Sequence, residues 1–156
     1  LTAMALLNNL LGGPGMNSRL NLNVREKYGF TYHIESYYQA YSDTGVFGIY
    51  LGTDKGQMKR SIDLVQRELR RMRERKLGVL QLSRAKKQLL GQLAIATENN
   101  GSLMLAVGKG LLQRDRFEDL NELSERVEAV TAEQVLELAN EVFDPRQLST
   151  LVYQAK

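Results

Sequence analysis

Arg25 and Tyr32 are the two residues whose types and spacing point most directly to chemistry. A phenol held in place can donate a hydrogen bond to the negative charge that develops on a carbonyl oxygen during peptide-bond hydrolysis. A guanidinium nearby can bind a substrate carbonyl or carboxylate through two donors. The pattern alone also fits a surface arginine and a packed tyrosine, so both interpretations stay open at this point.

A glycine-dense turn precedes this pair, because residues 11–15 read Leu-Gly-Gly-Pro-Gly. Glycine allows backbone angles and close approaches that a side chain forbids. Asn17 or Ser18 is expected to cap the amphipathic segment that follows, and Gly29 to end it before a strand. These elements would place both candidate residues on the same surface of the domain. Within the segment we expect apolar side chains to point inward and arginines to face water: Leu20, Val24 and, as a third candidate, Leu22 against Arg19 and Arg25.

The sequence offers few other groups for catalysis or metal binding. It contains no cysteine and one histidine, His33, so a zinc site of two histidines and a glutamate cannot form within it. On a strand, His33 and Glu35 would merely share a face. No nucleophile elbow, phosphate loop or dinucleotide fingerprint is present. The sequence therefore predicts no metal ligand in this chain.

Length and composition indicate one globular domain. The 156 residues are 43% hydrophobic and 25% charged, and no apolar run approaches the roughly 20 residues of a membrane span. The sequence begins at Leu1 inside an apolar helical pattern, which indicates a fragment of a longer polypeptide. The basic run at 59–76 could suggest nucleic acid. Without interleaved aromatic residues or a binding motif, a solvated helix face is the preferred interpretation.

Hydrophobic periodicity predicts an α+β domain with helices packed on one side of a mostly antiparallel sheet. Two strands form a hairpin, on which alternation places Tyr32 and Ile34 on the same face. A terminal strand is expected to join this sheet, and a segment upstream of Leu1 to supply its first strand. Expected helices are 2–11, 54–76, 81–98, 103–113, 117–130 and, after a capping box at Thr131, 132–142; expected strands are 30–41, 46–53 and 147–153.

Two motifs resemble the second-domain signature of the pitrilysin/insulinase zinc peptidases, the family that includes mitochondrial processing peptidase. They are Leu-Gly-Gly-Pro-Gly-Met-Asn-Ser-Arg-Leu at 11–20 and Val-Arg-Glu-Lys-Tyr-Gly-Phe-Thr-Tyr at 24–32. The resemblance continues in order through 45–53, 83–93 and 130–135, and so covers nearly the whole chain. Pro14 departs from it, since bacterial members commonly have a third glycine there. The zinc motif H-x-x-E-H is absent.

The resemblance implies a repeated α+β domain, with two copies facing each other across a closed chamber. One copy would bind zinc, and the other, represented by residues 1–156, would supply an arginine and a tyrosine. By position in the motif, Tyr32 would stabilise the tetrahedral oxyanion and Arg25 would position substrate. A substrate-binding glycine loop would comprise Gly12, Gly13 and Gly15.

The expected function is therefore that of the C-terminal, substrate-binding domain of a zinc metalloendopeptidase. Its partners would be a zinc-bearing N-terminal domain or subunit and a peptide substrate, with a homodimer of the parent also possible. A soluble protein of the bacterial cytoplasm or periplasm is favoured, with no nucleic-acid ligand. The alternative is a non-catalytic structural or peptide-presenting subunit of the same family.

Overall fold

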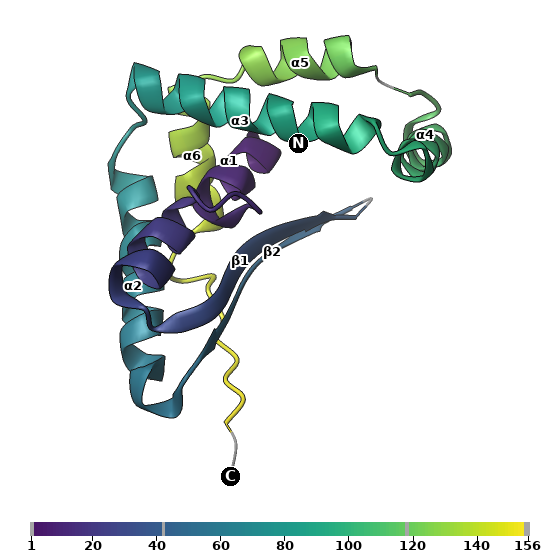
Figure 1. The fold of residues 1–156 in the computed structure, drawn as a ribbon. Coiled ribbons are helices and arrows are strands. Elements are labelled where there is room, and N and C mark those ends of the chain that lie inside the picture. The colour runs from purple at the N-terminus through teal and green to yellow at the C-terminus, as the bar shows by residue number, and fades with distance from the viewer. Residues whose placement is uncertain (1, 42, 118, 155–156) are drawn as a thin grey trace.

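A computed structural model describes residues 2–41, 43–117 and 119–154. Helices lie on one side of a two-stranded antiparallel sheet, so the predicted α+β arrangement is confirmed (Figure 1). None of the helices in the described residues is long and apolar enough to cross a membrane. The elements, in chain order, are α1 (Thr2–Gly12), the π-helix η1 (Asn21–Glu26), β1 (Thr31–Ala40), β2 (Gly45–Thr53), the 3₁₀ turn η2 (Lys55–Gln57), α2 (Met58–Glu74), α3 (Val79–Thr97), α4 (Asn100–Arg114), α5 (Leu120–Glu128) and α6 (Ala132–Val142).

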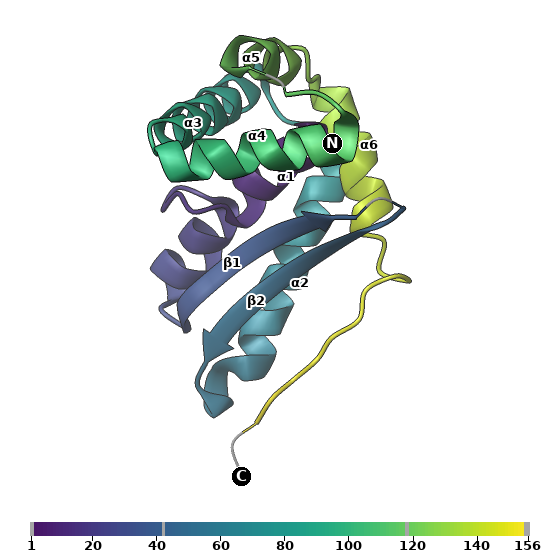
Figure 2. The same ribbon diagram turned by 90° about the vertical axis from the view of Figure 1, so that its right-hand side faces the viewer.

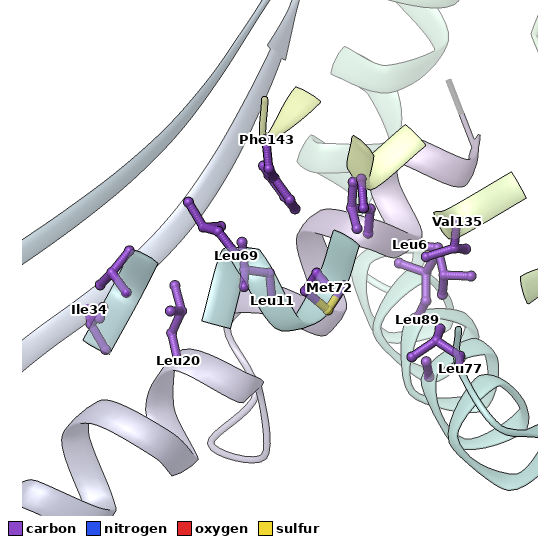
Figure 3. Packing of buried hydrophobic residues seen from close by; sticks show 14 of the residues in the cluster. Leu6, Leu11, Leu20, Ile34, Leu69, Met72, Leu77, Leu89, Val135 and Phe143 are labelled. Atoms are coloured by element: carbon purple, nitrogen blue, oxygen red, sulfur yellow. The ribbon is translucent and has the colours of Figure 1, made fainter. Parts of the chain in front are cut away.

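Helix α1 occupies the centre of the domain and packs against β1, α3, α5 and α6. Three of its leucines, Leu6, Leu7 and Leu11, are fully buried. Figure 3 shows Leu6 close to Val135 of α6, and Leu11 in the same cluster. A helix that is apolar around most of its surface is stable only when other elements surround it, and this explains its central place.

The sheet is a single hairpin, whose register pairs Ile34 with Leu51 and Tyr38 with Phe47. Ile34 is buried, and Phe47, Ile49 and Leu51 pack against the core from β2. Side chains on the other face of β1 remain in solvent. Since one face is buried and one exposed, slipping the register by one residue would expose Ile34, and burial therefore fixes the pairing.

Helix α2 packs against α6 and η1. Its buried stripe includes the predicted Val65, Leu69 and Met72, and also Leu64 and Glu68. The helix begins four residues later than expected because the turn η2 precedes it.

Capping residues set the ends of the later helices. The Asn99 side chain accepts a hydrogen bond from the Ser102 backbone N–H, so α4 begins before the expected residue 103. Asp119 caps α5 in the same way. The predicted capping box is confirmed: Thr131 Oγ1 accepts from Gln134 N, and Gln134 Oε1 accepts from Thr131 N.

The predicted terminal strand at 147–153 is wrong, because no β-ladder includes these residues. The segment runs down the β2 side of the sheet without joining it (Figure 2). Asp144 and Arg146 form a hydrogen-bonded turn at its start, which lowers the pKa of the Asp144 carboxyl to about 2. Leu151 is 77% exposed. The alternating apolar side chains of 147–153 therefore gain no burial from pairing with the sheet in any particular register.

Candidate functional site

The glycine turn lies in direct contact with the main chain of β1. A Cβ atom on Gly12 would be 2.6 Å from the Ser36 backbone nitrogen, and one on Gly13 would be 2.7 Å from the Asn9 Cα. Gly12 and Gly13 are buried, whereas Gly15 is partly exposed. The two buried glycines are needed because a side chain at either position would collide with the main chain of β1 or α1. The turn can therefore pack directly against both elements.

Replacing Gly12 by alanine should therefore lower the free energy of unfolding by about 1–3 kcal/mol, because an added methyl group would force the turn away from β1. Urea unfolding followed by circular dichroism would measure the change. Gly91→Ala is a matched control that should raise the free energy of unfolding. A Cβ there would meet nothing within 4 Å, and alanine is more favourable than glycine in the interior of a helix such as α3 by about 1 kcal/mol. Equal stability of the Gly12 variant and the wild type would contradict the close contact.

Buried polar side chains tie the turn to the start of η1. Asn21 Nδ2 donates to Ser18 Oγ at 2.8 Å and to the Gly15 carbonyl at 3.4 Å. The Ser18 backbone N–H donates to the same carbonyl at 3.0 Å. Ser18 and Asn21 are both buried, so water does not compete for these bonds. The turn and η1 therefore form one hydrogen-bonded unit.

The π-helix η1 positions Arg25. Leu20 and Val24 are fully buried, as predicted, and anchor one side of the segment in the core. The Arg25 side chain is 41% exposed, and its Nε lies 3.9 Å from Glu26 Oε1. Gly29, at φ +63°, ends the segment as expected. Single-turn π-helices are rare and are found frequently at functional sites.

A β-bulge turns the Tyr32 side chain outward. Thr31 pairs with Thr53, but His33 pairs with Gly52, so Tyr32 is an extra residue in β1. Thr31 Oγ1 donates a hydrogen bond shared between the His33 carbonyl at 2.7 Å and the Gly52 carbonyl, which holds the bulge. Thr31 takes the buried position, and Tyr32 is 82% exposed. The expectation that Tyr32 and Ile34 share a face is wrong for this reason.

Arg25 and Tyr32 thus both extend into solvent from consecutive fixed elements. Within the described residues, no hydrogen bond or cation–π contact joins the two side chains, and the Tyr32 hydroxyl has no hydrogen-bond partner. In this part of the chain, the Arg25 guanidinium forms only the long ion pair to Glu26. Both polar groups are therefore available to a ligand.

A surface hollow of about 400 Å³ lies next to the segment that joins the two residues. Tyr28 and Phe30 line it, with their ring centroids 5.5 Å apart. Helix α2 supplies the opposite wall, where the Arg60 guanidinium lies 6.0 Å from the centre of the Phe30 ring. Arg67 also lines the hollow, which therefore combines aromatic faces with positive charge.

A buried carboxylate on α2, the helix that contacts η1, was not predicted from the hydrophobic periodicity. Glu68 of α2 is only 2% exposed, and its Oε1 accepts a hydrogen bond from Arg71 Nη1 at 2.6 Å. Arg19, expected to face water, is instead partly buried. This desolvation lowers the pKa of Arg19, and the negative charge of Glu68 opposes the shift. Its position in the sequence could have indicated this burial, because Glu68 lies three residues after Val65 and four before Met72 on the buried stripe.

Zinc does not fit the described part of this chain. No group of three or more histidine, cysteine, aspartate or glutamate side chains there is arranged to hold a metal ion. The His33 Nε2 lies 3.4 Å from Glu35 Oε1 on the exposed face of β1, and the two residues form a pair without a third ligand.

The fold and the site together define an α+β domain that presents an arginine and a tyrosine but holds no metal-ligand set in its described residues. Residues 1–89 match the family model described as the peptidase M16 inactive domain. The chain belongs to this family, and the resemblance to zinc peptidases predicted from the sequence is confirmed.

Relatives of the chain include named zinc proteases. It is 34% identical over 140 residues to an uncharacterized zinc protease of Bacillus subtilis, and the matched region covers 90% of this chain and 34% of that protein. It is 30% identical over 133 residues to mitochondrial-processing peptidase subunit alpha of Rattus norvegicus, covering 84% of this chain and 25% of the relative. The chain thus spans about a third or less of the length of these relatives.

Solved structures show the same fold. The peptidase M16 inactive domain from Pseudomonas fluorescens superposes with a TM-score of 0.77 and 28% sequence identity, covering 90% of this chain and 33% of that one. A conserved protein from Enterococcus faecalis superposes with a TM-score of 0.73 at 25% identity, covering 89% and 32% of the two chains.

Proposed function

We propose that this chain is the substrate-binding domain that completes the active site of a zinc metalloendopeptidase acting on peptides or unfolded segments. The observation that supports this function best is the pair of solvent-exposed polar groups on Arg25 and Tyr32. Each side chain extends from an element that buried contacts hold in place. A site that supplies fixed donors without binding metal suits the second half of a peptidase site.

Tyr32 supplies the donor for the transition state. When a peptide carbonyl becomes tetrahedral, its oxygen gains negative charge, and a phenolic O–H aimed at it lowers the barrier. The bulge at Thr31 holds Tyr32 outside the pleat of β1, where a substrate can approach it.

Arg25 binds substrate. Its guanidinium presents several donors to a main-chain carbonyl or a carboxylate. The Glu26 partner is 3.9 Å away at the surface, so exchanging it for substrate costs little. Gly15 can offer its partly exposed main chain to an extended peptide, while Gly12 and Gly13 fix the turn beneath it.

The zinc of the parent enzyme would belong to another domain or to a partner subunit. The described residues of this chain contain no suitable ligand set, so its own contribution is limited to binding and hydrogen-bond donation. A two-part site of this kind requires the zinc-bearing partner to face the surface that carries Arg25 and Tyr32. A homodimer of the parent is a further possibility for the assembly.

Replacing Arg25 by alanine in the parent protein should raise KM roughly 10- to 100-fold for a quenched fluorescent peptide, because a charged hydrogen bond to substrate is lost. The bound zinc, measured by atomic absorption, should stay unchanged. Arg75→Ala is the matched control, since Arg75 is an exposed arginine directly after α2 and precedes Lys76, which pairs with Glu133 of α6. Unchanged KM in the Arg25 variant would remove Arg25 from substrate binding.

The second candidate function is a non-catalytic, peptide-presenting subunit. The absence of a metal-ligand set in the described residues favours it as much as the first candidate. The same experiment separates them: a wild-type assembly that binds the peptide without cleaving it would support the non-catalytic subunit.

A further inference from the structure

Gln88 joins helix α3 to the glycine turn. Its Oε1 atom accepts a hydrogen bond from Asn17 Nδ2 at 2.8 Å, between residues that are 71 positions apart in the sequence. The turn therefore lies beside α3 as well as against α1 and β1 (Figure 2). Among the described residues, no other hydrogen bond ties the turn to α3.

The amide group of Gln88 also fills the space beside Gly15. Its Nε2 atom is buried and has no hydrogen-bond partner in the part of the chain that the structure describes. A Cβ atom on Gly15 would collide with this nitrogen and would lie 2.6 Å from Asn17 Oδ1. The side chains of Asn17 and Gln88 thus occupy the place that a side chain at position 15 would need, and glycine leaves it free for them.

The position of Gly15 affects the candidate site through the main chain. The Gly15 carbonyl accepts hydrogen bonds from the Ser18 backbone N–H at 3.0 Å and from Asn21 Nδ2 at 3.4 Å. Asn21 is the first residue of η1, the element that carries Arg25. A continuous set of contacts therefore leads from Gln88 on α3, through the turn, to η1.

Tyr32 has a separate support. The bulge that turns it outward is held by Thr31, whose hydroxyl donates to the Gly52 carbonyl of β2. No hydrogen bond within the described residues links Gln88 to this bulge. Loosening the glycine turn should therefore disturb the turn and η1 while the Tyr32 hydroxyl keeps its place.

We propose that Gln88 is a positioning residue of the candidate site: through its hydrogen bond to Asn17 and its packing against Gly15, it holds the glycine turn in the position from which the turn and η1 bind substrate. The statement about substrate rests on the proposed function. The effect of Gln88 on the turn does not, and it can be measured separately.

The first test compares Gln88→Met with the wild type in the parent protein. Methionine keeps the approximate length and volume of the side chain but removes both of its polar atoms. Hydrogen–deuterium exchange of the backbone amides in 15–22 should become about two- to tenfold faster, the effect of losing one hydrogen bond, while exchange in the β1–β2 hairpin stays unchanged. Gln92→Met is the matched control, because Gln92 is a partly buried glutamine of α3 whose side chain forms no hydrogen bond within the described residues.

Asn17→Ala tests the same hydrogen bond from its other end. Asn17 is exposed, and its truncation should give the same increase in exchange as Gln88→Met. If the two residues act through their shared hydrogen bond, the double variant Asn17→Ala/Gln88→Met should exchange no faster than either single variant. Multiplicative increases in the double variant would overturn the proposed route.

Kinetics test the link to substrate. Gln88→Met should raise KM for the quenched fluorescent peptide about two- to tenfold, since a displaced turn and η1 bind substrate less well. The value of kcat and the zinc content should stay unchanged, because Tyr32 keeps its own support. A fall in kcat larger than the rise in KM would indicate general structural damage and would overturn the positioning role.

Unchanged exchange in 15–22 would overturn the inference whatever the kinetics show. Faster exchange in Gln88→Met without a change in KM, in a protein whose KM rises in Arg25→Ala, would overturn the link to substrate and leave the proposed function standing. Unchanged KM in Arg25→Ala, with faster exchange in Gln88→Met, would instead refute the proposed function and leave the effect of Gln88 on the turn supported. If Gln88→Met does not fold, Asn17→Ala decides the same outcomes from an exposed position.

Discussion

Replacement of Tyr32 by phenylalanine should lower kcat of the proposed parent peptidase about 10²- to 10³-fold, because the proposed function gives its phenol as one donor to the developing oxyanion. The substitution deletes only the hydroxyl, which has no hydrogen-bond partner within the described residues. Since the ring is 82% exposed, the free energy of unfolding should barely change. Steady-state cleavage of a quenched fluorescent peptide, with bound zinc quantified in parallel, would measure the loss.

Tyr41→Phe is the control for this experiment. Tyr41 is another exposed tyrosine, which directly follows β1 at the end of the strand that is distant from Tyr32. It should retain wild-type kcat. A Tyr32→Phe enzyme with full kcat would show that the phenol plays no part in the transition state, and the exposed tyrosine would then be a surface residue only.

Replacement of Phe143 by alanine should lower the free energy of unfolding by about 3–5 kcal/mol. Phe143 lies at the C-terminal end of α6 and is 1% exposed. Its ring meets Phe47 of β2 edge to face, with centroids 5.2 Å apart at 71°. Truncation would remove this contact and leave a cavity between the helical layer and the sheet. Urea unfolding would report the change as a lower midpoint at an unchanged m-value.

Leu151→Ala serves as the control for Phe143→Ala and also tests the terminal segment. Leu151 is an apolar residue of similar hydrophobicity, but it is 77% exposed and belongs to no strand. Its truncation should alter stability by less than about 0.5 kcal/mol. A loss of several kcal/mol would indicate that residues 147–153 pack into the sheet after all.

The helices and the hairpin could be predicted because their signals are local. Apolar spacing along α2 and α6 and the capping box at Thr131 each depend on neighbouring residues. The terminal strand was predicted on equally good alternation, but a strand also needs a partner. Nothing within 147–153 reveals whether a sheet edge is available to it.

The candidate site, too, could be predicted only in part from the sequence. The order of glycine turn, amphipathic segment, Arg25 and Tyr32 could be predicted from the sequence, because each lies close to the next along the chain. The outward direction of Tyr32 could not, since the bulge depends on Thr31 bonding across to β2. The burial of Glu68 was missed despite its position on the buried stripe, because it appears as one more charge in a basic helix.

The sequence by itself therefore determined the family, the main elements and the identity of the residues proposed to act. Only the tertiary structure decided which face Tyr32 occupies, that Glu68 of α2 is buried, and that the last segment remains outside the sheet. The physical reason is that periodicity and capping are short-range effects. Burial, strand pairing and charge compensation are set by contacts between residues far apart in the chain, such as Phe47 with Phe143.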